Sequence, residues 1–367
     1  ELIDGRIDAR DIKDIKLEDL LRRQQVKIDT KSIELYLKGK SILVTGAAGS
    51  IGSEICRQIM RFSPKKIIMV DIDETRIFDV YKELKDKFIN ADIIFVVADI
   101  KDRVKMEKLF ERENPQVIFH AGAYKHVPVM ELYPEEAVKT NIFGTQVIAE
   151  CAAKYGSCKF VLISTDKAVN PSSVMGATKS VAEMIVSKFN QKAPGKFVTV
   201  RFGNVLESRG NMFSIFSQQI RERRSVTVTD ANMQRYLMSI SEAVLLVLEA
   251  AIIDEPGDIF TLNMGEPVKI IDVVKAMIRL YGYEPDKDIP IVFTGIRPGE
   301  KLFEECLLDS EEVIKSKYDD ILIAKSNAYI NSDDLELYMG KLNILADQAD
   351  KTGIIKLLQE MIPGYRK

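Results

Sequence analysis

The chain has 367 residues, 46% hydrophobic and 29% charged, which is long enough to fold around a large core with a second, smaller lobe. Its 52 basic and 55 acidic residues leave a formal net charge of −3, and no Lys/Arg block lacks compensating acids, which argues against a nucleic-acid partner. With only two histidines, His120 and His126, and four cysteines at no zinc or redox spacing, no metal site is expected.

Residues 1–40 are charged and are interpreted as an N-terminal extension of the main domain. An amphipathic patch within them predicts a short helix: Ile15, Leu17, Leu20 and Leu21. The longest apolar run, residues 243–253, contains Glu249 and is too short to cross a bilayer. Because the sequence starts with Glu1 instead of Met, we expect a processed chain from which an upstream membrane segment has been removed.

From Ser41 onward, continuous apolar runs alternate with segments whose apolar residues recur at helical spacing. The expected strands are residues 41–45, 65–71, 93–99, 116–122, 159–164 and 196–203. The expected helices are residues 53–62, 75–88, 103–112, 134–155 and 175–191. Continuous apolar strands are typical of buried parallel sheets, and the repeated alternation predicts an α/β fold of the Rossmann type, a doubly wound parallel sheet with right-handed crossovers.

The pattern weakens after the last of these strands, where shorter elements and Gly/Pro turns follow. We therefore expect residues 41–204 to form a dinucleotide-binding Rossmann domain, with a strand near 259–263 returning to its sheet. Residues 205–330 are expected to form a smaller, discontinuous C-terminal substrate lobe interleaved with that domain, and residues 331–367 a C-terminal helical segment.

A glycine-rich turn joins the first expected strand to the first expected helix, and its glycines, at G-x-x-G-x-x-G spacing, are Gly46, Gly49 and Gly52. Glycine allows a tight turn and a close approach of the main chain to a pyrophosphate, and the helix N-terminus at Ser50 and Ile51 offers N–H groups to the anion. A glycine-rich turn by itself can have a purely structural role, without binding a ligand. Asp71 ends the next strand about twenty residues later, where a carboxylate can bind the adenosine ribose, and the combination predicts a dinucleotide site.

The same carboxylate bears on the choice of cofactor. Asp71 repels a 2′-phosphate and favours NAD, although the nearby Arg76 keeps NADP open. Asp99 and Ile100, at the end of the third strand, are expected to contact the adenine; alternatively, Asp99 caps the following helix. Small residues after the fourth strand let the main chain approach the nicotinamide half of the cofactor: Ala121, Gly122 and Ala123.

The segment Val161–Lys179 has the spacing of a dehydrogenase active site, in which a tyrosine carries a proton and a lysine follows four residues later. Met175 stands at the tyrosine position and cannot carry a proton, so the acid and the base must lie elsewhere. The adjacent Asp166 and Lys167 are the first candidates, although such a pair can also be a solvent-exposed ion pair. Met175 could equally be a core residue, the usual role of methionine in a helix.

Six motifs occur in order along the chain: TGAAGSIGSE, HAGAYKHVPVME, NIFGT, STDKAVNPSSVMGATK, RFGNV and RPGEK. Together they resemble the extended short-chain dehydrogenase/reductase superfamily and, more narrowly, the UDP-N-acetylglucosamine 4,6-dehydratases of bacterial polysaccharide and glycan synthesis. The resemblance covers residues 17–305. The long, membrane-linked form of these enzymes likewise has methionine in place of tyrosine, which implies NAD regenerated in each turnover and retention of the C5 configuration.

The resemblance implies a role for each residue of the catalytic stretch. Thr165 would bind the sugar O4, Asp166 would protonate the departing C6 hydroxyl, and Lys167 would remove the C5 proton, which requires a lowered lysine pKa. Lys179 would bind the nicotinamide ribose. Because neighbours on a regular strand face opposite sides, the chain is expected to leave strand geometry here.

The resemblance also implies the residues that hold the substrate. Lys125 and His126 would border the sugar, although His126 could instead be an ordinary hydrogen-bonded loop residue. The UDP moiety would be held by Asn204, Arg235, Arg297 and Glu300, since a guanidinium matches phosphate oxygens. Asn141 would satisfy main-chain groups. Glu207 stands where relatives have glycine, so a different loop is expected after it.

Three functions stay open on the sequence. A dehydratase would remove water from a UDP-sugar, an epimerase on the same fold would yield an isomer of unchanged mass, and a non-catalytic NAD-binding regulator would show no turnover. The Asp166-Lys167 pair favours the dehydratase. The resemblance further implies the cytoplasmic domain of a bacterial protein anchored in the inner membrane, a homo-oligomer with a UDP-sugar as its partner.

Overall fold

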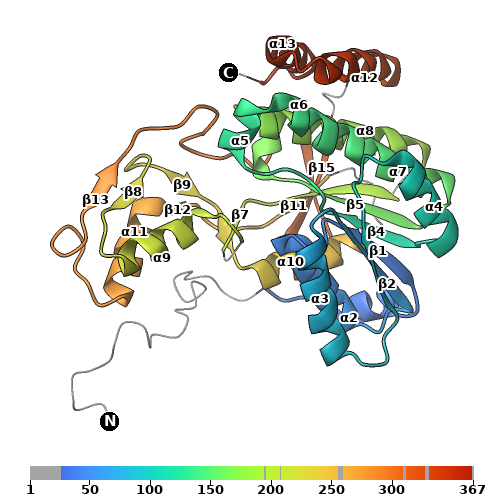
Figure 1. Cartoon of the computed structure of the whole chain (residues 1–367), viewed down its shortest axis with the longest axis horizontal. Coiled ribbons are helices and arrows are strands. Elements are labelled where there is room, and N and C mark those ends of the chain that lie inside the picture. The colour runs from blue at the N-terminus through green and yellow to red at the C-terminus, as the bar shows by residue number, and fades with distance from the viewer. Residues whose placement is uncertain are drawn as a thin grey trace.

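The computed structural model describes residues 26–193, 196–206, 208–254, 259–308, 311–326 and 330–365. The helix expected at Ile15 to Leu21 and the position of Glu207 lie outside these residues. The strands of the main sheet are β1 (Ser41–Thr45), β2 (Lys66–Asp71), β3 (Ile93–Val97), β4 (Val117–His120), β5 (Lys159–Ile163), β6 (Phe197–Arg201), β11 (Ile259–Leu262), β14 (Glu311–Lys315) and β15 (Ile321–Ser326). They form one nine-stranded sheet in the order β14-β15-β11-β6-β5-β4-β1-β2-β3 (Figure 1).

The sheet is parallel from β3 to β11, and β15 with β14 adds an antiparallel hairpin at one edge. The predicted doubly wound α/β fold is therefore confirmed, and each of the six predicted strands occurs with its ends shifted by one or two residues at most. The winding reverses between β1 and β4, because β1 continues to β2 on one side while β4 lies on the other. Ligands of such sheets bind at this reversal, outside the carboxyl ends of the strands.

Helices cover both faces of the sheet, because successive strand residues point to opposite sides. In β1, Ile42 and Val44 belong to one core cluster and Leu43 belongs to the other. The first face is covered by α1 (Thr30–Leu37), α2 (Ser50–Met60), α3 (Glu74–Lys87) and α10 (Ile240–Ala251). The second face is covered by α4 (Arg103–Glu113), α7 (Thr145–Lys154) and α8 (Val174–Lys192).

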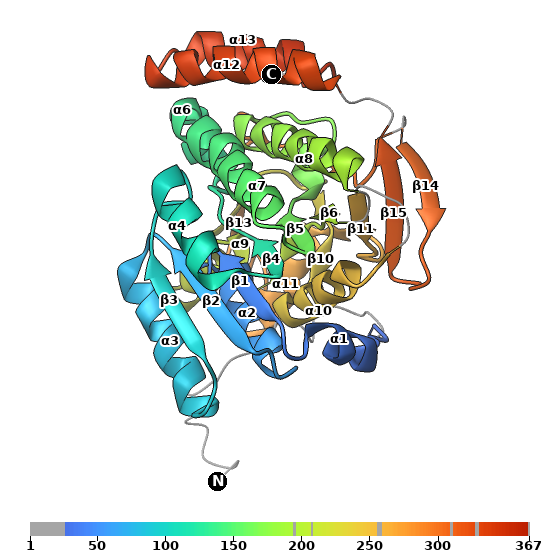
Figure 2. The same ribbon diagram turned by 90° about the vertical axis from the view of Figure 1, so that its right-hand side faces the viewer.

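A further layer lies outside the second face. Helices α12 (Ser332–Asp347) and α13 (Lys351–Met361) pack on α6 (Pro134–Ala137) and α8, as Figure 2 shows at its upper edge. Leu335, Leu342 and Leu358 are buried at this contact and extend the second core cluster.

The helix predicted over residues 134–155 is divided into α6, a π-helical segment (Val138–Gly144) and α7. Gly144 packs directly on Ile100, because a Cβ at this glycine would lie 2.6 Å from the Ile100 Cδ1. Asn141, inside the π-helical segment, accepts a hydrogen bond from the N–H of Tyr124 (2.8 Å) and donates one to its carbonyl (3.0 Å). The predicted structural role of Asn141 is confirmed.

A small lobe, left in Figure 1, has its own core of Phe213, Phe216, Val274 and Ile278 with their neighbours. Its elements are α9 (Met212–Arg221), β8 (Val226–Val228), β9 (Gln234–Arg235), β12 (Val268–Lys269), α11 (Ile270–Leu280) and β13 (Ile291–Phe293). The short strands β7 (Asn204–Val205) and β10 (Leu237–Met238) pair where this lobe meets the main domain.

The assignment of residues 205–330 to the substrate lobe is wrong for two parts of that range. Helix α10 packs on α2 in the first core cluster, and the β14–β15 hairpin extends the main sheet through β15 and β11. Local apolar patterns do not reveal these partners, since pairing is set by distant segments. Among the described residues, no helix is both long and apolar enough to span a bilayer.

Candidate active site

Two glycines fix the turn between β1 and α2. Gly46 has a φ of +67°, and a Cβ on it would lie 2.6 Å from the carbonyl carbon of Ala121. A Cβ on Gly52 would overlap the carbonyl oxygen of Gly46 and lie 2.7 Å from its carbonyl carbon. Gly49 is less restricted, with the Gly46 oxygen 3.1 Å from its virtual Cβ. The turn thus brings β1, β4 and α2 together at the reversal point, with the first N–H groups of α2 available to an anion.

A main cavity of about 730 Å³ runs along this edge of the sheet. This volume lies within the range of roughly 300–1,000 Å³ typical of ligand sites. Besides the glycine turn, with Ser50 and Ile51, the predicted residues that line it are Asp71, Asp99, Ile100, Ala121, Gly122, Ala123, Lys125, His126, Thr165, Lys167, Met175, Lys179 and Asn204. The structure therefore brings most of the predicted cofactor residues and four of the five predicted catalytic ones, all but Asp166, to a single cavity.

The acidic residues at one end of this cavity are held by the main chain. Asp71 accepts hydrogen bonds from the N–H groups of Ala48 (2.8 Å) and Asp73 (3.0 Å), which orients the carboxylate at the turn. Asp99 accepts one from the N–H of Lys101 (2.9 Å). It is Asp102, and not Asp99, that caps α4, so the alternative role for Asp99 is wrong.

Arg76 does not line either cavity described here. Its Nε lies 3.8 Å from Asp73 Oδ2, an ion pair across the first turn of α3. The structure thus places Arg76 beside Asp73, which lines the main cavity with Asp71, but not among the lining residues themselves.

Lys179 and Met175 lie one turn apart on α8. The Lys179 ammonium donates to the main-chain oxygen of Ile163 (2.7 Å), and burial lowers the pKa of this lysine to about 8. Met175 is 5% exposed, belongs to the second core cluster and also lines the main cavity, so both interpretations of this residue hold. Gly176 lets α8 approach the main chain at Lys167, because a Cβ there would overlap the carbonyl oxygen of Lys167.

The chain leaves strand geometry here as predicted, because Asp166–Ala168 form a 3₁₀ turn. Asp166 Oδ1 accepts from the Thr165 hydroxyl (2.8 Å) and from the Lys167 ammonium (2.9 Å). Thr165 and Lys167 line the main cavity, but Asp166 is fully buried and lines neither cavity. This geometry does not favour Asp166 as the direct proton donor to a substrate.

The expected lowering of the Lys167 pKa is wrong. Burial lowers it, but the negative charges of Asp166 and Glu304 outweigh burial and the net pKa is raised. Lys167 Nζ lies 3.5 Å from Glu304 Oε1 and also donates to Asn204 Oδ1 (2.9 Å). Sequence reasoning missed Glu304, which directly precedes Glu305; no local signal tells which of two adjacent glutamates turns inward.

A smaller cavity of about 170 Å³ adjoins the first and shares Lys167, Asn204 and Met212 with it. Its wall also includes Arg235, Arg297, Glu300, Lys301 and Glu304. Four predicted substrate residues thus line this cavity, Asn204, Arg235, Arg297 and Glu300, and Arg297 is exposed.

Arg235 contrasts with Arg297. Its guanidinium, 3% exposed, donates to the main-chain oxygens of Gln234 (2.7 Å), Lys301 (2.8 Å) and Leu302 (3.2 Å). These bonds fix the loop that carries Arg297 and leave fewer N–H groups for a phosphate. Arg235 therefore anchors the loop as well as lining the smaller cavity, and its contact with a phosphate stays a prediction.

Residues 208–212, which follow β7, line the main cavity. Lys125 donates to the main-chain oxygen of Arg209 (2.8 Å), and the N–H of Arg209 donates to the hydroxyl of Ser50 in the cofactor turn (3.0 Å). His126 lies beside Gly210, whose virtual Cβ would be 2.7 Å from the imidazole. These contacts connect the small lobe to the Gly-rich turn.

His120 is buried between two threonines, with Nδ1 2.6 Å from the Thr45 hydroxyl and Nε2 3.0 Å from that of Thr145. Burial, aided by the charge of Lys179, lowers its pKa to about 3, so the imidazole is neutral at physiological pH. No cluster of three or more potential metal ligands occurs within the described part of the chain.

The nine-stranded sheet, the glycine turn at its reversal point and the adjoining cavity define a doubly wound α/β protein of the Rossmann type. A family model described as "Polysaccharide biosynthesis protein" matches residues 42–326, and the chain belongs to this family.

Three known proteins illustrate the relationship. The chain is 50% identical over 328 residues to the probable polysaccharide biosynthesis protein EpsC of Bacillus subtilis, which covers 89% of this chain and 54% of that protein. It is 45% identical over 335 residues to the capsular polysaccharide biosynthesis protein CapD of Staphylococcus aureus, covering 91% and 56%. The chain thus spans about half the length of these two relatives. The X-ray structure of Pen from Bacillus thuringiensis is similar with a TM-score of 0.71 and 32% identity, over 80% of this chain and 91% of that chain.

Proposed function

We propose that this protein catalyses the NAD-dependent 4,6-dehydration of UDP-N-acetylglucosamine with retention at C5. One juxtaposition carries the proposal: Thr165, Lys167 and Met175 line the main cavity where it meets the smaller cavity with Arg297 in its wall. A dinucleotide in the main cavity and a sugar nucleotide in the smaller one would then meet at Lys167. Hydride transfer between two bound molecules needs such proximity.

The residues present fit NAD. The cavity beside the Gly46–Gly52 turn would let a pyrophosphate come close to the main chain. Asp71 lines the same cavity at the end of β2, the position from which a carboxylate binds the adenosine ribose in this fold. NAD would supply the hydride acceptor for C4 and the donor for C6. Lys179 would hold the nicotinamide ribose, and its buried charge would provide positive potential beside the reacting carbon.

The chain's own groups then handle the sugar. The Thr165 hydroxyl, at the cavity wall, can hydrogen-bond to O4, and Arg297 can bind the diphosphate. Asp166 accepts from both Thr165 and Lys167, so its role is to hold these two groups in position.

The proposal is tested by mass spectrometry of the reaction with NAD and UDP-N-acetylglucosamine. We expect a product lighter by one water and no net reduced cofactor. An isomer of unchanged mass would indicate an epimerase instead, and NAD binding without any turnover would indicate a regulator.

Substitutions of Asp166 and Lys167 test whether these residues are needed for the reaction. Lys167→Ala and Asp166→Asn are both expected to abolish turnover while NAD binding, measured by titration, survives. Lys87→Ala is the matched control, because Lys87 is 61% exposed on α3 and pairs only with the surface carboxylate of Glu83 among the contacts described. Full activity of Lys167→Ala would exclude this lysine from the chemistry.

A further inference from the structure

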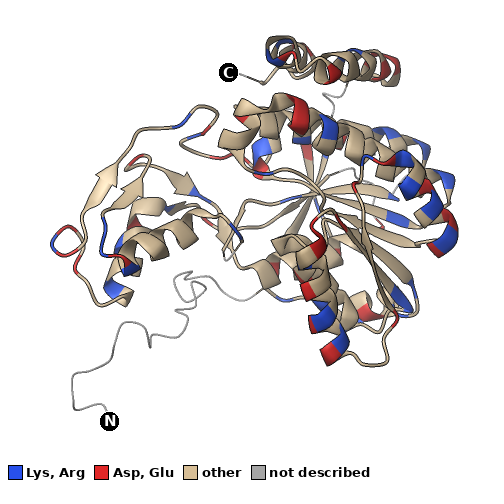
Figure 3. Cartoon of the chain, viewed as in Figure 1, with Lys and Arg blue, Asp and Glu red and all other residues tan. Residues whose placement is uncertain are grey.

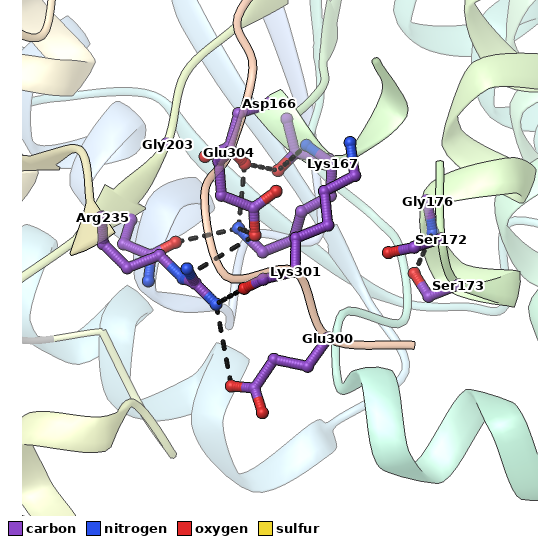
Figure 4. Close-up of polar contacts among 12 residues, drawn as sticks. Asp166, Lys167, Ser172, Ser173, Gly176, Gly203, Arg235, Glu300, Lys301 and Glu304 are labelled. Atoms are coloured by element: carbon purple, nitrogen blue, oxygen red, sulfur yellow. Dashed lines mark hydrogen bonds and ion pairs between the residues drawn. The ribbon is translucent and has the colours of Figure 1, made fainter. Parts of the chain in front are cut away.

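A buried group of four charges lies where the two cavities meet. Lys167 contacts Asp166 (2.9 Å) and Glu304 (3.5 Å), and Arg235 lies 3.7 Å from the same oxygen of Glu304, as Figure 4 shows. The side chains of Asp166, Glu304 and Arg235 are at most 3% exposed, whereas Lys167 is 23% exposed. Two negative carboxylates and two positive side chains therefore balance in charge in a nearly dry environment, where each charge strongly affects its neighbours.

Glu304 differs from the other acid of this group. It lines the smaller cavity, and its Oε1 faces Lys167 and Arg235. Its second oxygen, Oε2, is buried and has no hydrogen-bond partner among the described residues. Asp166 Oδ2 is likewise buried without a hydrogen-bond partner in the described part of the chain, so Glu304 is distinguished by its place at the cavity wall, where a ligand can reach the carboxylate.

Asp166 has the complementary arrangement. It lines neither cavity, and its Oδ1 receives the hydrogen bonds of both Thr165 and Lys167. A fully buried carboxylate that lines neither cavity can hold the ammonium in position but has no surface for contact with a sugar. Asp166 is thus a positioning residue for Lys167.

We propose that Glu304 is the base that removes the C5 proton and that the Lys167 ammonium is the acid that protonates the departing C6 hydroxyl. This assignment rests on the dehydration proposed above. The family resemblance implies that Lys167 is the base, whereas here it is the acid. The base is instead Glu304, a carboxylate that follows the RPGEK loop.

The step balances in atoms and charge. Once C4 is a ketone, the C5–H bond breaks; its proton goes to Glu304 and its electron pair forms the C5=C6 double bond. The C6–O bond breaks, and the hydroxyl leaves with the Lys167 proton as water. When C6 is later reduced, Glu304 returns its proton to C5 from the same face, which accounts for retention. Lys167, part-exposed, regains a proton from solvent in place of the one that O4 released.

The charge state of the lysine supports this assignment. Burial lowers the Lys167 pKa, but the charges of Asp166 and Glu304 raise it further than burial lowers it, so the amine carries its proton at rest. A general acid must be protonated before the reaction and a general base must not be. A lysine held between two carboxylates meets the first requirement.

Hydrogen–deuterium exchange at C5 of the sugar distinguishes Glu304 as the base from Lys167 as the base. Wild type, Glu304→Gln and Lys167→Gln are incubated with NAD and UDP-N-acetylglucosamine in D₂O, and water loss and deuterium at C5 of the recovered sugar are measured. We expect both variants to lose dehydration by roughly 10²–10⁴-fold, the usual contribution of a general acid or base. Lys167→Gln should still place deuterium at C5, because the base remains and the ketone, which cannot lose water quickly, persists long enough for the proton on Glu304 to exchange with D₂O. Glu304→Gln should not.

The opposite pattern, exchange in Glu304→Gln and none in Lys167→Gln, would overturn the assignment, as would dehydration by Glu304→Gln at the wild-type rate. Glu305→Gln is the matched control, since Glu305 is the adjacent glutamate, 54% exposed and paired with Lys301; its activity should be unchanged. If wild type gives no dehydrated product, the proposed function itself fails. If wild type dehydrates and only the exchange pattern disagrees, the function stands and the role of Glu304 falls.

A measurement on wild type decides the matter if Glu304→Gln does not fold, as judged by thermal unfolding and NAD titration. Substrate deuterated at C5 is converted in ordinary water. A buried carboxyl carries a single proton and should return most of the label, whereas an ammonium scrambles three protons and would return roughly one third or less. A product with one third of the label or less would refute Glu304 as the base.

Discussion

Replacing Gly52 by alanine should damage the cofactor turn far more than replacing Gly49. The new Cβ at Gly52 would lie 2.7 Å from the carbonyl carbon of Gly46 and overlap its oxygen, both main-chain atoms that no rotamer change can move. Relief requires β1 and α2 to separate by about 1 Å to reach a normal carbon–carbon contact. At Gly49 the closest atom is 3.1 Å away, so a shift of a few tenths of an ångström suffices.

The cost of such overpacking is about 1–3 kcal/mol. For a domain of this size that corresponds to a fall in Tm of roughly 2–4 °C per kcal/mol. Because the displaced turn is also the proposed pyrophosphate site, NAD affinity should fall by about tenfold or more, tenfold being 1.4 kcal/mol. Thermal unfolding with and without NAD, together with a binding titration, measures both effects.

Gly340→Ala in α12 serves as the control, because nothing lies within 4 Å of its virtual Cβ and the position is helical. It should leave NAD affinity unchanged and raise stability by up to about 1 kcal/mol. A Gly52→Ala protein with the wild-type Tm and NAD affinity would refute the packing argument at the turn.

Three further predictions concern single groups. Asp71→Asn should narrow the preference for NAD over NADP in paired titrations, because the carboxylate that repels a 2′-phosphate is gone; an unchanged ratio would count against its role. Glu311→Gln should lower the free energy of unfolding by about 3 kcal/mol in chemical denaturation, since Arg201 is buried with carboxylates of Glu311 and Glu183 on either side; a change below about 1 kcal/mol would contradict this. Burial lowers the Lys179 pKa to about 8, so the ammonium loses its proton as pH rises through that value and NAD affinity should fall, whereas Lys179→Arg should bind independently of pH over that interval.

The parallel sheet could be predicted from the sequence because each of its strands is a short apolar, β-branched run that stays buried on both faces. The β14–β15 hairpin could not, since Glu311, Glu312 and Lys315 interrupt its pattern at the sheet edge and its pairing with β11 depends on a segment far away. Helix α10 was visible as an apolar run, but its contact with α2 has no local signature.

At the candidate site, the sequence likewise predicts which residues come together but not how their side chains are oriented. Motif spacing correctly predicted that Asp71, Thr165 and Lys179 would gather at one cavity, because the carboxyl ends of parallel strands share an edge. The inward turn of Glu304, the burial of Asp166 and the raised pKa of Lys167 follow from tertiary contacts that spacing does not encode.

The chain enters the small lobe between β6 and α10, returns to the sheet, and enters the lobe again between β11 and β14. No single cut can therefore release either the small lobe or the main domain as a continuous polypeptide. Exchanging the small lobe between relatives would require two insertions that still pair β9 with β12 and β8 with β13. If this lobe binds the proposed sugar nucleotide, its selectivity is expected to diverge through individual substitutions on the cavity loops, while the two interwoven parts are inherited together.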